Sequence, residues 1–469
     1  MSDTLMISVS GMRGHVGTDL TPELVARHAA ALGAWVRSAG RRDAAGAARP
    51  CVVLGRDSRT SGPMFARAAA AGLMSVGVDV VDLGVVPTPT VQMAVEHHHA
   101  GAGLILTASH NPIEWNALKF VGPDGIFLDA ESGAAVRSLA EKGPARASWD
   151  KLGTMLDDPE AVDRHFDAIL ALSVIDVAAI RARRFHVALD TVRGAGGASI
   201  PLLLERLGCQ VTGINLAADG RFPRAPEPIP ENLTELGQLV RESGADIGMA
   251  VDPDVDRLAL VDEQGKAIGE DYTLAFAVRA VLSRESRVES RELAEPPIVV
   301  VNLSTSLVVE DAARDGGAVF ERAAVGEANV ARAMRDRGAV IGGEGNGGVM
   351  FPALHIGRDA PLGVALILHH LAQSGRTVSE LVAASPSYSI VKDKAPRGGD
   401  LAALYRALRT QFADAAVDER DGLRLGWQDR WLHVRPSGTE PIVRLIAEAP
   451  TAAEARALIA AGSSLMHQG

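Results

Sequence analysis

The sequence lacks any long hydrophobic run, and this absence excludes one class of protein. No stretch of about 18 apolar residues occurs in the chain, so no segment is expected to span a membrane. The first residues, MSDTLMISVSGMRGHV, also lack a basic segment followed by an apolar one, and we therefore expect no signal peptide. Together these absences predict a cytoplasmic protein with no membrane partner.

Cysteine and aromatic residues are scarce in the chain, and its net charge is negative. Only Cys51 and Cys209 are present, which favours buried thiols in a reducing compartment over a disulfide. The net charge is −11, so we expect no basic footprint for a nucleic acid partner, and an anionic substrate would need local positive charge. Aromatic residues make up 4% of the chain, which suits α/β layers with helices packed closely on sheets.

One pattern occurs three times along the chain. Segments beginning at Cys51, His186 and Ile298 each run from a short Val/Ile/Leu-rich stretch through a polar loop to a helical periodicity, a glycine and a second apolar stretch. This βαβ pattern predicts largely parallel sheets that are covered by helices. A chain of 469 residues is too long for one hydrophobic core, so the repeats indicate three similar α/β domains.

The C-terminal part has a different pattern. Residues 386–400 are rich in proline, glycine and charge and are predicted to be a linker. A helix, a hairpin around residues 428–430, a third strand and a last helix over residues 452–466 are then expected, which indicates a smaller α+β unit. The predicted domains are residues 1–155, 156–266, 267–384 and 385–469.

A serine follows an apolar run in LILTASHNPIEWNALKF, residues 104–120. In parallel α/β sheets, ligands bind at the carboxyl ends of the strands, where Ser109 is expected to lie. A lone serine is not nucleophilic, so it must be activated or must already carry a group. The sequence Thr-Ala-Ser-His-Asn is not the G-x-S-x-G turn of hydrolases, and the adjacent His110 is poorly placed to act as its base. On this evidence alone, Ser109 can equally be a turn or cap residue.

Three carboxylates alternate in AVDPDVDRLALVD, at Asp252, Asp254 and Asp256. Carboxylates this close repel one another unless a cation lies between them, and oxygen ligands favour Mg²⁺ or Ca²⁺. The spacing resembles an EF-hand, with Glu263 at position twelve, but Arg257 stands where that loop needs glycine and no helix follows. The EF-hand is therefore rejected, and a solvated acidic turn is the alternative to a magnesium site.

The stretch IGGEGNGGVMFP contains a formal G-x-G-x-x-G at Gly343, Gly345 and Gly348. A dinucleotide-binding loop should open a helix, whereas an apolar stretch and a proline follow here, so the match is weak. The glycines instead allow the backbone to approach a ligand closely. Glu344 and Asn346 would then present polar groups suited to hydroxyls.

A second polar loop, VRPSGTEPIVR, lies in the C-terminal unit. Its guanidinium groups, hydroxyls and loop amides make a cradle for a phosphate. The chain contains no P-loop, so a nucleoside triphosphate grip is excluded. The candidate residues are Arg435, Ser437, Gly438, Thr439 and Arg444.

Four motifs, T-A-S-H-N-P, D-P-D-V-D-R, G-E-G-N-G-G and R-P-S-G-T-E-P, resemble in order and spacing those of the α-D-phosphohexomutases. The resemblance covers essentially the whole chain. It implies three α/β domains and a smaller fourth around a central cleft. It also implies transfer of phosphate between C6 and C1 of a hexose phosphate, through a phosphoserine enzyme and a hexose 1,6-bisphosphate.

The resemblance further implies a role for each candidate residue. Ser109 is similar to the phosphorylated serine and Lys119 to the lysine proposed for proton transfer. The implied Mg²⁺ ligands are Ser109, Asp252, Asp254 and Asp256. The other implied active-site residues are Arg13, His110 and Arg257. Glu344 and Asn346 resemble the readers of sugar hydroxyls, and the residues of the phosphate cradle resemble a distal phosphate clamp.

One departure from the family pattern stands in the sugar loop. Some members have G-E-M-S-G-H, whose histidine assists proton transfer, and here Gly348 takes its place. The motif SGMRG favours phosphoglucosamine mutase, which converts glucosamine 6-phosphate to glucosamine 1-phosphate, and the alternative is a phosphomannomutase/phosphoglucomutase. A nicotinamide-dependent dehydrogenase and a catalytically silent sugar-phosphate binder are the competing hypotheses. A monomer or a homodimer is expected.

Overall fold

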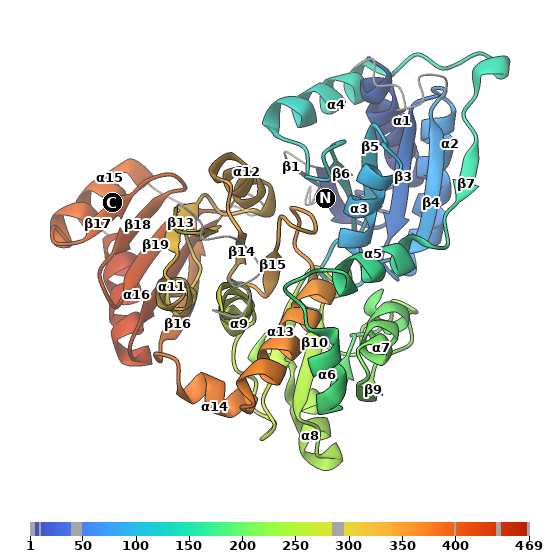
Figure 1. Ribbon diagram of the computed structural model, residues 1–469. Helices are drawn as coiled ribbons and strands as arrows, with labels where there is room; N and C mark the ends of the chain where they lie inside the picture. Colours follow the sequence, from blue (N-terminus) through green and yellow to red (C-terminus); the bar gives the residue numbers. More distant parts are fainter. Residues whose placement is uncertain are drawn as a thin grey trace.

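The computed structural model describes residues 5–8, 11–38, 49–283, 295–397, 400–437 and 442–466. In this part of the chain four sheets follow one another, each with its own helices, and we name the four units domains I to IV (Figure 1). The predicted fold class, three α/β domains and a smaller α+β domain, is confirmed. None of the described helices is long and apolar enough to cross a membrane.

Domain I contains a seven-stranded sheet in the order β1-β2-β6-β5-β3-β4-β7. Its strands are β1 (Met6–Ser8), β2 (Gly11–His15), β3 (Cys51–Arg56), β4 (Asp79–Val85), β5 (Ala102–Leu106), β6 (Trp115–Val121) and β7 (Met155–Asp157). Apolar side chains pack the helices α1 (Pro22–Ser38), α2 (Gly62–Met74) and α4 (Ala130–Lys142) on one face, and α3 (Thr88–His97) on the other. Strand β5 is buried along its whole length, which gives the loop after it a rigid base.

Domains II and III repeat the central part of this sheet. Their strand orders, β11-β10-β8-β9 and β15-β14-β12-β13, correspond to β6-β5-β3-β4 of domain I. The strands are β8 (His186–Asp190), β9 (Gln210–Ile214), β10 (Ile247–Val251), β11 (Leu258–Val261), β12 (Ile298–Asn302), β13 (Val319–Ala323), β14 (Ile341–Glu344) and β15 (Gly348–Met350). The threefold repeat seen in the sequence is therefore one topology used three times.

Helices surround these two sheets and connect the domains. Helices α5 (Ala161–Leu170) and α6 (Val177–Arg183) lead from domain I to domain II, which adds α7 (Gly196–Arg206) and α8 (Thr234–Ser243). Domain III adds α9 (Asp271–Leu282), α11 (Leu307–Asp315), α12 (Glu327–Arg337), α13 (Ala360–Ser374) and α14 (Val378–Ala383). One continuous apolar cluster extends from domain II into domain III, so these two domains share a core.

The repeated topology places three loops at equivalent positions. In each copy a central strand is followed by a loop and by a strand that returns antiparallel, as in the pairs β5/β6, β10/β11 and β14/β15. The first loop carries Ser109, the second the three aspartates, and the third Asn346. All three polar loops therefore join a central strand to its antiparallel neighbour.

Domain IV is an antiparallel sheet in the order β16-β20-β19-β18-β17. Its elements are β16 (Ser389–Pro396), α15 (Leu401–Gln411), β17 (Ala416–Asp418), β18 (Leu423–Gly426), β19 (Trp431–Pro436), β20 (Ile442–Ala449) and α16 (Ala452–Met466). The predicted hairpin is the β18/β19 pair, and the predicted last helix is α16.

The prediction of a linker over residues 386–400 is wrong for most of that stretch. Residues 389–396 form the edge strand β16, which pairs with β20 over eight residues. An edge strand has one unpaired side, so charged residues are tolerated there, and Pro396 can end the strand because it has no amide to donate. The polar composition of residues 389–396 reflects their position at the sheet edge and not a linker.

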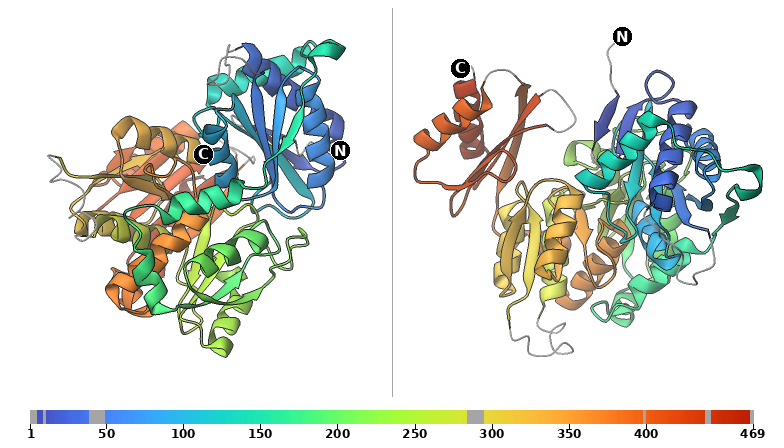
Figure 2. Two further views of the ribbon diagram at one scale, coloured as in Figure 1. Left: turned by 45° about the vertical axis from the view of Figure 1, so that its right-hand side comes forward. Right: turned by 90° about the horizontal axis from the view of Figure 1, so that it is seen from above.

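Domain IV lies beside domain III, as the two views of Figure 2 show. Glu448 of β20 is fully buried in this contact: it accepts hydrogen bonds from the Leu307 amide at 2.8 Å, from the Ser306 hydroxyl and from Nε1 of Trp431 at 2.6 Å. A carboxylate at the amino end of α11 also interacts favourably with the helix dipole. A domain IV side chain thus caps a domain III helix and holds the two units together.

Candidate active site

The serine loop turns sharply after β5. Ser109 has a φ of 48°, a left-handed conformation that is uncommon outside glycine and that persists only where the surroundings impose it. Its amide donates to Oγ1 of Thr107 at 2.9 Å. The backbone thus lifts the Ser109 hydroxyl out of the sheet edge.

Arg59 holds this loop in shape. The guanidinium donates to the carbonyl oxygens of Ser109, Asn111, Pro112 and Trp115 at 2.6, 2.7, 2.6 and 3.0 Å. Its charge is balanced by Asp57, 3.0 Å away, and both side chains are fully buried. Arg59 was not among the predicted site residues, because an arginine in the polar stretch GRDSRTSG gives no sign that it reaches a loop 50 residues away.

The metal-binding candidates lie directly against the serine. Oγ of Ser109 donates to Oδ2 of Asp252 at 2.7 Å, and ligand atoms of Asp252, Asp254 and Asp256 lie within 4.8 Å of one another. Burial and the two neighbouring carboxylates raise the pKa of Asp252 well above its ordinary value. Oδ1 of Asp254 and Oδ1 of Asp256 are buried without a hydrogen-bond partner.

This donor set fits a hard divalent cation. It offers only oxygen atoms, which are the ligands that hard cations such as Mg²⁺ prefer. A bound ion would also offset the concentrated negative charge and contact the two buried oxygens that lack a hydrogen-bond partner. Val255, inside the loop, has a φ of 62°, which is a strained conformation for a β-branched residue. The loop is thus held in a shape that brings its carboxylates together.

Cationic and neutral groups of domain I face the same carboxylates. Nζ of Lys119 lies 2.8 Å from Oδ2 of Asp254, and this interaction helps to hold the pKa of Asp254 below its usual range although burial opposes it. The ring of His110 lies 3.3 Å from Oγ of Ser109. Burial, with the nearby Arg257 and Arg13, keeps the pKa of His110 well below its usual value, so the imidazole is neutral at neutral pH.

Arg13 and Arg257 complete the wall of one cavity. The Arg13 guanidinium donates to Oδ1 of Asn111 at 2.7 Å, which aligns it with the serine loop. A cavity of about 350 Å³ is lined by residues of domains I, II and III, among them Arg13, Ser109, Lys119 and Arg257. The structure thus brings together every residue that the sequence analysis placed around the serine.

The sugar loop is anchored by its glutamate. Glu344 is buried; Oε1 accepts from Nδ2 of Asn302 at 2.8 Å and from the Gly326 amide at 3.0 Å, and Oε2 accepts from Arg358 at 2.7 Å. Asn346 accepts from the Gly348 amide at 3.2 Å, which tightens the turn. Much of the hydrogen-bonding capacity of Glu344 therefore serves to shape the loop.

Arg358 joins the metal loop to the sugar loop. Its two terminal nitrogens lie 2.6 Å from Oδ2 of Asp256 and 2.7 Å from Oε2 of Glu344, and its Nε lies 3.2 Å from Oε2 of Glu327. Burial alone would lower its pKa, but the three carboxylates raise the pKa of Arg358 well above the ordinary value. No sequence pattern points to this residue, because its partners come from other loops.

Arg358 also explains the glycine at position 348. A Cβ atom added to Gly348 would lie 2.2 Å from Cδ of Arg358. Because three carboxylates hold the guanidinium, this part of the side chain cannot move away. The histidine that some family members carry at this place has no room here.

The phosphate-clamp candidates lie on domain IV. Arg435 of β19 and Lys394 of β16 both pair directly with Arg444 of β20, so the three side chains lie on one face of the sheet. The amide of Ser437 donates to the carbonyl of Ile442 at 2.8 Å. Gly438 and Thr439 lie outside the described residues. Lys394 was missed by the sequence analysis because its strand was predicted to be a linker.

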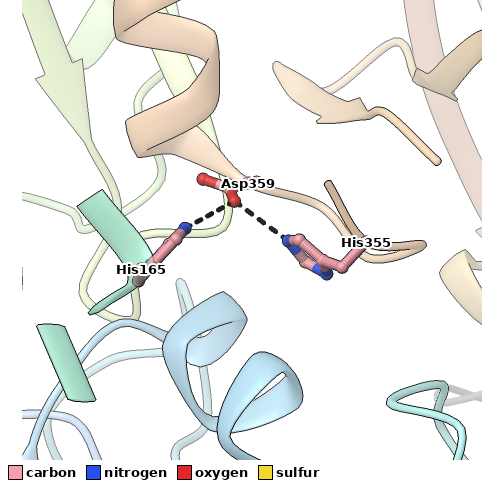
Figure 3. A group of neighbouring side chains, drawn as sticks. All are labelled: His165, His355 and Asp359. Atoms are coloured by element: carbon pink, nitrogen blue, oxygen red, sulfur yellow. Dashed lines mark hydrogen bonds and ion pairs between the residues drawn. The ribbon is translucent and has the colours of Figure 1, made fainter. Parts of the chain in front are cut away.

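A second cluster of potential metal ligands lies among the described residues, at His165, His355 and Asp359 (Figure 3). Nε2 of His165 and Nε2 of His355 lie 2.8 and 2.9 Å from the same oxygen of Asp359, and Nδ1 of His165 lies 2.9 Å from Oγ1 of Thr90. Hydrogen bonds donated by the two Nε2–H groups account for this geometry. We interpret the cluster as a structural link between α3, α5 and the start of α13 that fixes the residue next to Arg358.

Family models match four consecutive parts of the chain. Residues 5–147, 163–265 and 270–388 match the alpha/beta/alpha domains I, II and III of phosphoglucomutase/phosphomannomutase, and residues 388–461 match its C-terminal domain. This four-domain fold, with a serine beside three aspartates, identifies the chain as a mutase. Mutases are a class of isomerases. The chain belongs to the α-D-phosphohexomutase family.

Relatives of known name agree with this assignment. A phosphoglucomutase/phosphomannomutase of Thermococcus kodakarensis is 38% identical, with 98% of this chain and 97% of the relative covered. A probable phosphoglucosamine mutase of Methanopyrus kandleri is 36% identical, with 96% and 95% covered.

Solved structures show the same fold. A phosphoglucomutase/phosphomannomutase family protein of Burkholderia thailandensis superposes with a TM-score of 0.83 at 26% identity, over 98% of both chains. An N-acetylphosphoglucosamine mutase of Aspergillus fumigatus, in complex with GlcNAc-6P and magnesium, superposes with a TM-score of 0.59 at 15% identity, over 98% of this chain and 95% of that one.

Removing the Arg358 guanidinium should destabilise the protein strongly. Arg358→Met leaves three buried carboxylates without their cation, so we expect a loss of about 3–5 kcal/mol of unfolding free energy in urea titrations. Arg335→Met, which removes an exposed ion pair with Asp124, is the matched control and should cost less than about 1 kcal/mol. Equal losses in the two variants would contradict the assigned role of Arg358.

Proposed function

We propose that the chain catalyses the reversible transfer of phosphate between C6 and C1 of a hexose phosphate, with Ser109 as the phosphate carrier. The observation that carries this proposal is the 2.7 Å contact between the Ser109 hydroxyl and Asp252, in a cavity that Lys119, Arg13 and Arg257 also line. A serine beside an acidic cluster and several cations suits phosphoryl transfer. This reaction depends mainly on positioning the reactants and on offsetting the negative charge of the transferred phosphoryl group.

The metal of this site is proposed to be Mg²⁺, held by Ser109 and the three aspartates. When bound, the ion would neutralise charge on the transferring phosphoryl group. Arg13 of domain I and Arg257 of the metal loop in domain II supply further positive charge to the cavity. The neutral His110 ring, packed against the serine, supports the hydroxyl without adding charge.

In the proposed reaction, a sugar hydroxyl attacks the phosphorus atom on Ser109. The bond between phosphorus and Oγ breaks, a bond to the sugar oxygen forms, and the hydroxyl proton passes to a base, for which Lys119 in its neutral amine form is the candidate. The product is a hexose 1,6-bisphosphate. After it turns around, Oγ of Ser109 attacks its other phosphorus atom, the bond from that phosphorus to the sugar oxygen breaks, and the sugar oxygen takes the proton back from the base. This regenerates the phosphoserine and releases the isomerised monophosphate.

Domain IV is proposed to hold the phosphate that is not reacting. Arg435 and Arg444 present guanidinium groups on one sheet face, which suits a dianionic phosphate, and Ser437, Gly438 and Thr439 are the further candidates. Glu344 and Asn346 are proposed to contact sugar hydroxyls. A clamp that reads only the phosphate can accept either end of the bisphosphate, as the reaction requires.

The preferred sugar is proposed to be glucosamine 6-phosphate. Relatives named probable phosphoglucosamine mutase, at 36% and 34% identity, support this choice, whereas the relative at 38% identity bears the name phosphoglucomutase/phosphomannomutase, which supports the alternative. We propose a cytoplasmic monomer or homodimer with no nucleic acid partner.

Loss of the Ser109 hydroxyl should abolish turnover. Ser109→Ala removes the group that carries the phosphate, so we expect the rate to fall by at least about 1,000-fold while the fold is kept. Intact-mass spectrometry should find one phosphate on the wild-type protein and none on the variant. Ser148→Ala, on an exposed loop, is the control. Turnover of Ser109→Ala at the wild-type rate would refute the proposal.

Removal of divalent metal should stop the reaction without unfolding the protein. Treatment with a chelator is expected to abolish turnover, and added Mg²⁺ to restore it. In a titration with Mn²⁺ followed by electron paramagnetic resonance, Asp256→Asn should weaken binding at least about tenfold. The control is Glu263→Gln, because the Glu263 carboxylate contacts Ser379 and not the metal loop. This variant should bind Mn²⁺ as the wild type does. Full activity in excess chelator would exclude a metal role.

Rates on three sugars should identify the substrate. With a hexose 1,6-bisphosphate as primer, we expect kcat/KM to be highest on glucosamine 6-phosphate, compared with mannose 1-phosphate and glucose 1-phosphate. A preference for mannose or glucose would assign the alternative activity. Turnover of none of them would leave the silent-binder hypothesis standing.

A further inference from the structure

The clamp arginine of domain IV is held by a carboxylate that also contacts domain III. Nε of Arg435 donates to Oδ2 of Asp421 at 2.8 Å. The same oxygen accepts the amide of Val325 at 3.2 Å. The Asp421 and Arg435 side chains are 19% and 17% exposed, so the pair is only partly screened by water.

A chain of hydrogen bonds continues from this contact to the metal loop. The amide of Gly326, the next residue after Val325, donates to Oε1 of Glu344 at 3.0 Å. The other oxygen of Glu344 accepts from Arg358 at 2.7 Å, and Arg358 reaches Asp256 at 2.6 Å. The phosphate clamp, the sugar loop and the metal loop are therefore in continuous contact.

The turn that carries Asp421 is itself fixed. Nε2 of His433 lies 2.7 Å from the carbonyl oxygen of Asp421, and Nδ1 of His433 lies 2.8 Å from Oγ of Ser304 in domain III. Gly422 has a φ of 78°, and a Cβ there would lie 2.4 Å from the carbonyl oxygen of Val434, so the turn packs directly on β19. Asp421 thus has little freedom to leave Arg435.

We propose that Asp421 is a positioning residue that aims Arg435 at the distal phosphate and ties domain IV to the loop of Val325 and Gly326. This inference rests on the proposed function, in which Arg435 binds phosphate. With Nε committed to Asp421, the guanidinium meets a phosphate with its two terminal nitrogens, which form a fork suited to two phosphate oxygens. The carboxylate fixes the direction of that fork before substrate arrives.

The test is a double-mutant cycle on substrate affinity. Asp421→Asn keeps the size of the side chain but removes its charge, and we expect KM for glucosamine 6-phosphate to rise roughly tenfold with kcat changed less than about threefold. In an Arg435→Ala background, the same substitution should change KM less than about twofold, since the residue it acts through is absent. Asp418→Asn, in the same hairpin but paired with the exposed Arg420, is the control and should match the wild type.

Two outcomes would overturn the inference. Wild-type kinetics for Asp421→Asn would show that the carboxylate does not aim Arg435, and a tenfold effect that persists in the Arg435→Ala background would show a general structural role. If Asp421→Asn does not fold, Asp421→Glu keeps the charge, moves the oxygen by one methylene, and is read in the same cycle. Failure of the proposed function is distinguishable, because the wild type would then turn over no hexose phosphate.

Discussion

The structure depends on concentrated negative charge at the point where its domains meet. Asp252, Asp254 and Asp256 are buried on one loop of domain II, where their mutual repulsion would be prohibitive without nearby cations. Domain I supplies Lys119 to Asp254, and domain III supplies Arg358 to Asp256. Each domain therefore completes the electrostatics of another, and the relative placement of domains I, II and III follows from charge compensation as well as from apolar packing.

The fold and the reactive loops could be predicted because their signals are local. Each α/β unit reveals itself by short apolar runs that alternate with helical periodicity, and each loop keeps its chemistry within a few residues, as in the alternate aspartates after β10. The resemblance to a known family then gave Ser109, Lys119 and Arg13 their expected neighbours, and the structure brings these residues to one cavity. Local pattern thus identified the reactive loops, and the resemblance added Arg13 and Lys119, which lie on the strands β2 and β6.

The residues that hold those loops could not be predicted. Arg59 reaches four carbonyls about 50 positions along the chain, and Arg358 contacts a carboxylate 102 positions away. A lone arginine in a polar loop has the same appearance in the sequence whether it is solvated or buried against carboxylates. The strand β16 was not predicted for a related reason: pairing with β20 at a sheet edge requires no alternation of apolar residues. Lys394 lies on this strand and was therefore not predicted either.

The charge arrangement also restricts how a proton can move within the proposed mechanism. Since Arg358 compensates Asp256 and Glu344, its side chain fills the space beside Gly348, and a histidine in the sugar loop would collide with it. The candidate proposed to take the proton of the attacking hydroxyl lies on the domain I side, where Lys119 contacts Asp254. The arginine at position 358 and the glycine at position 348 therefore depend on each other, because a side chain at position 348 would collide with the arginine that compensates the two carboxylates.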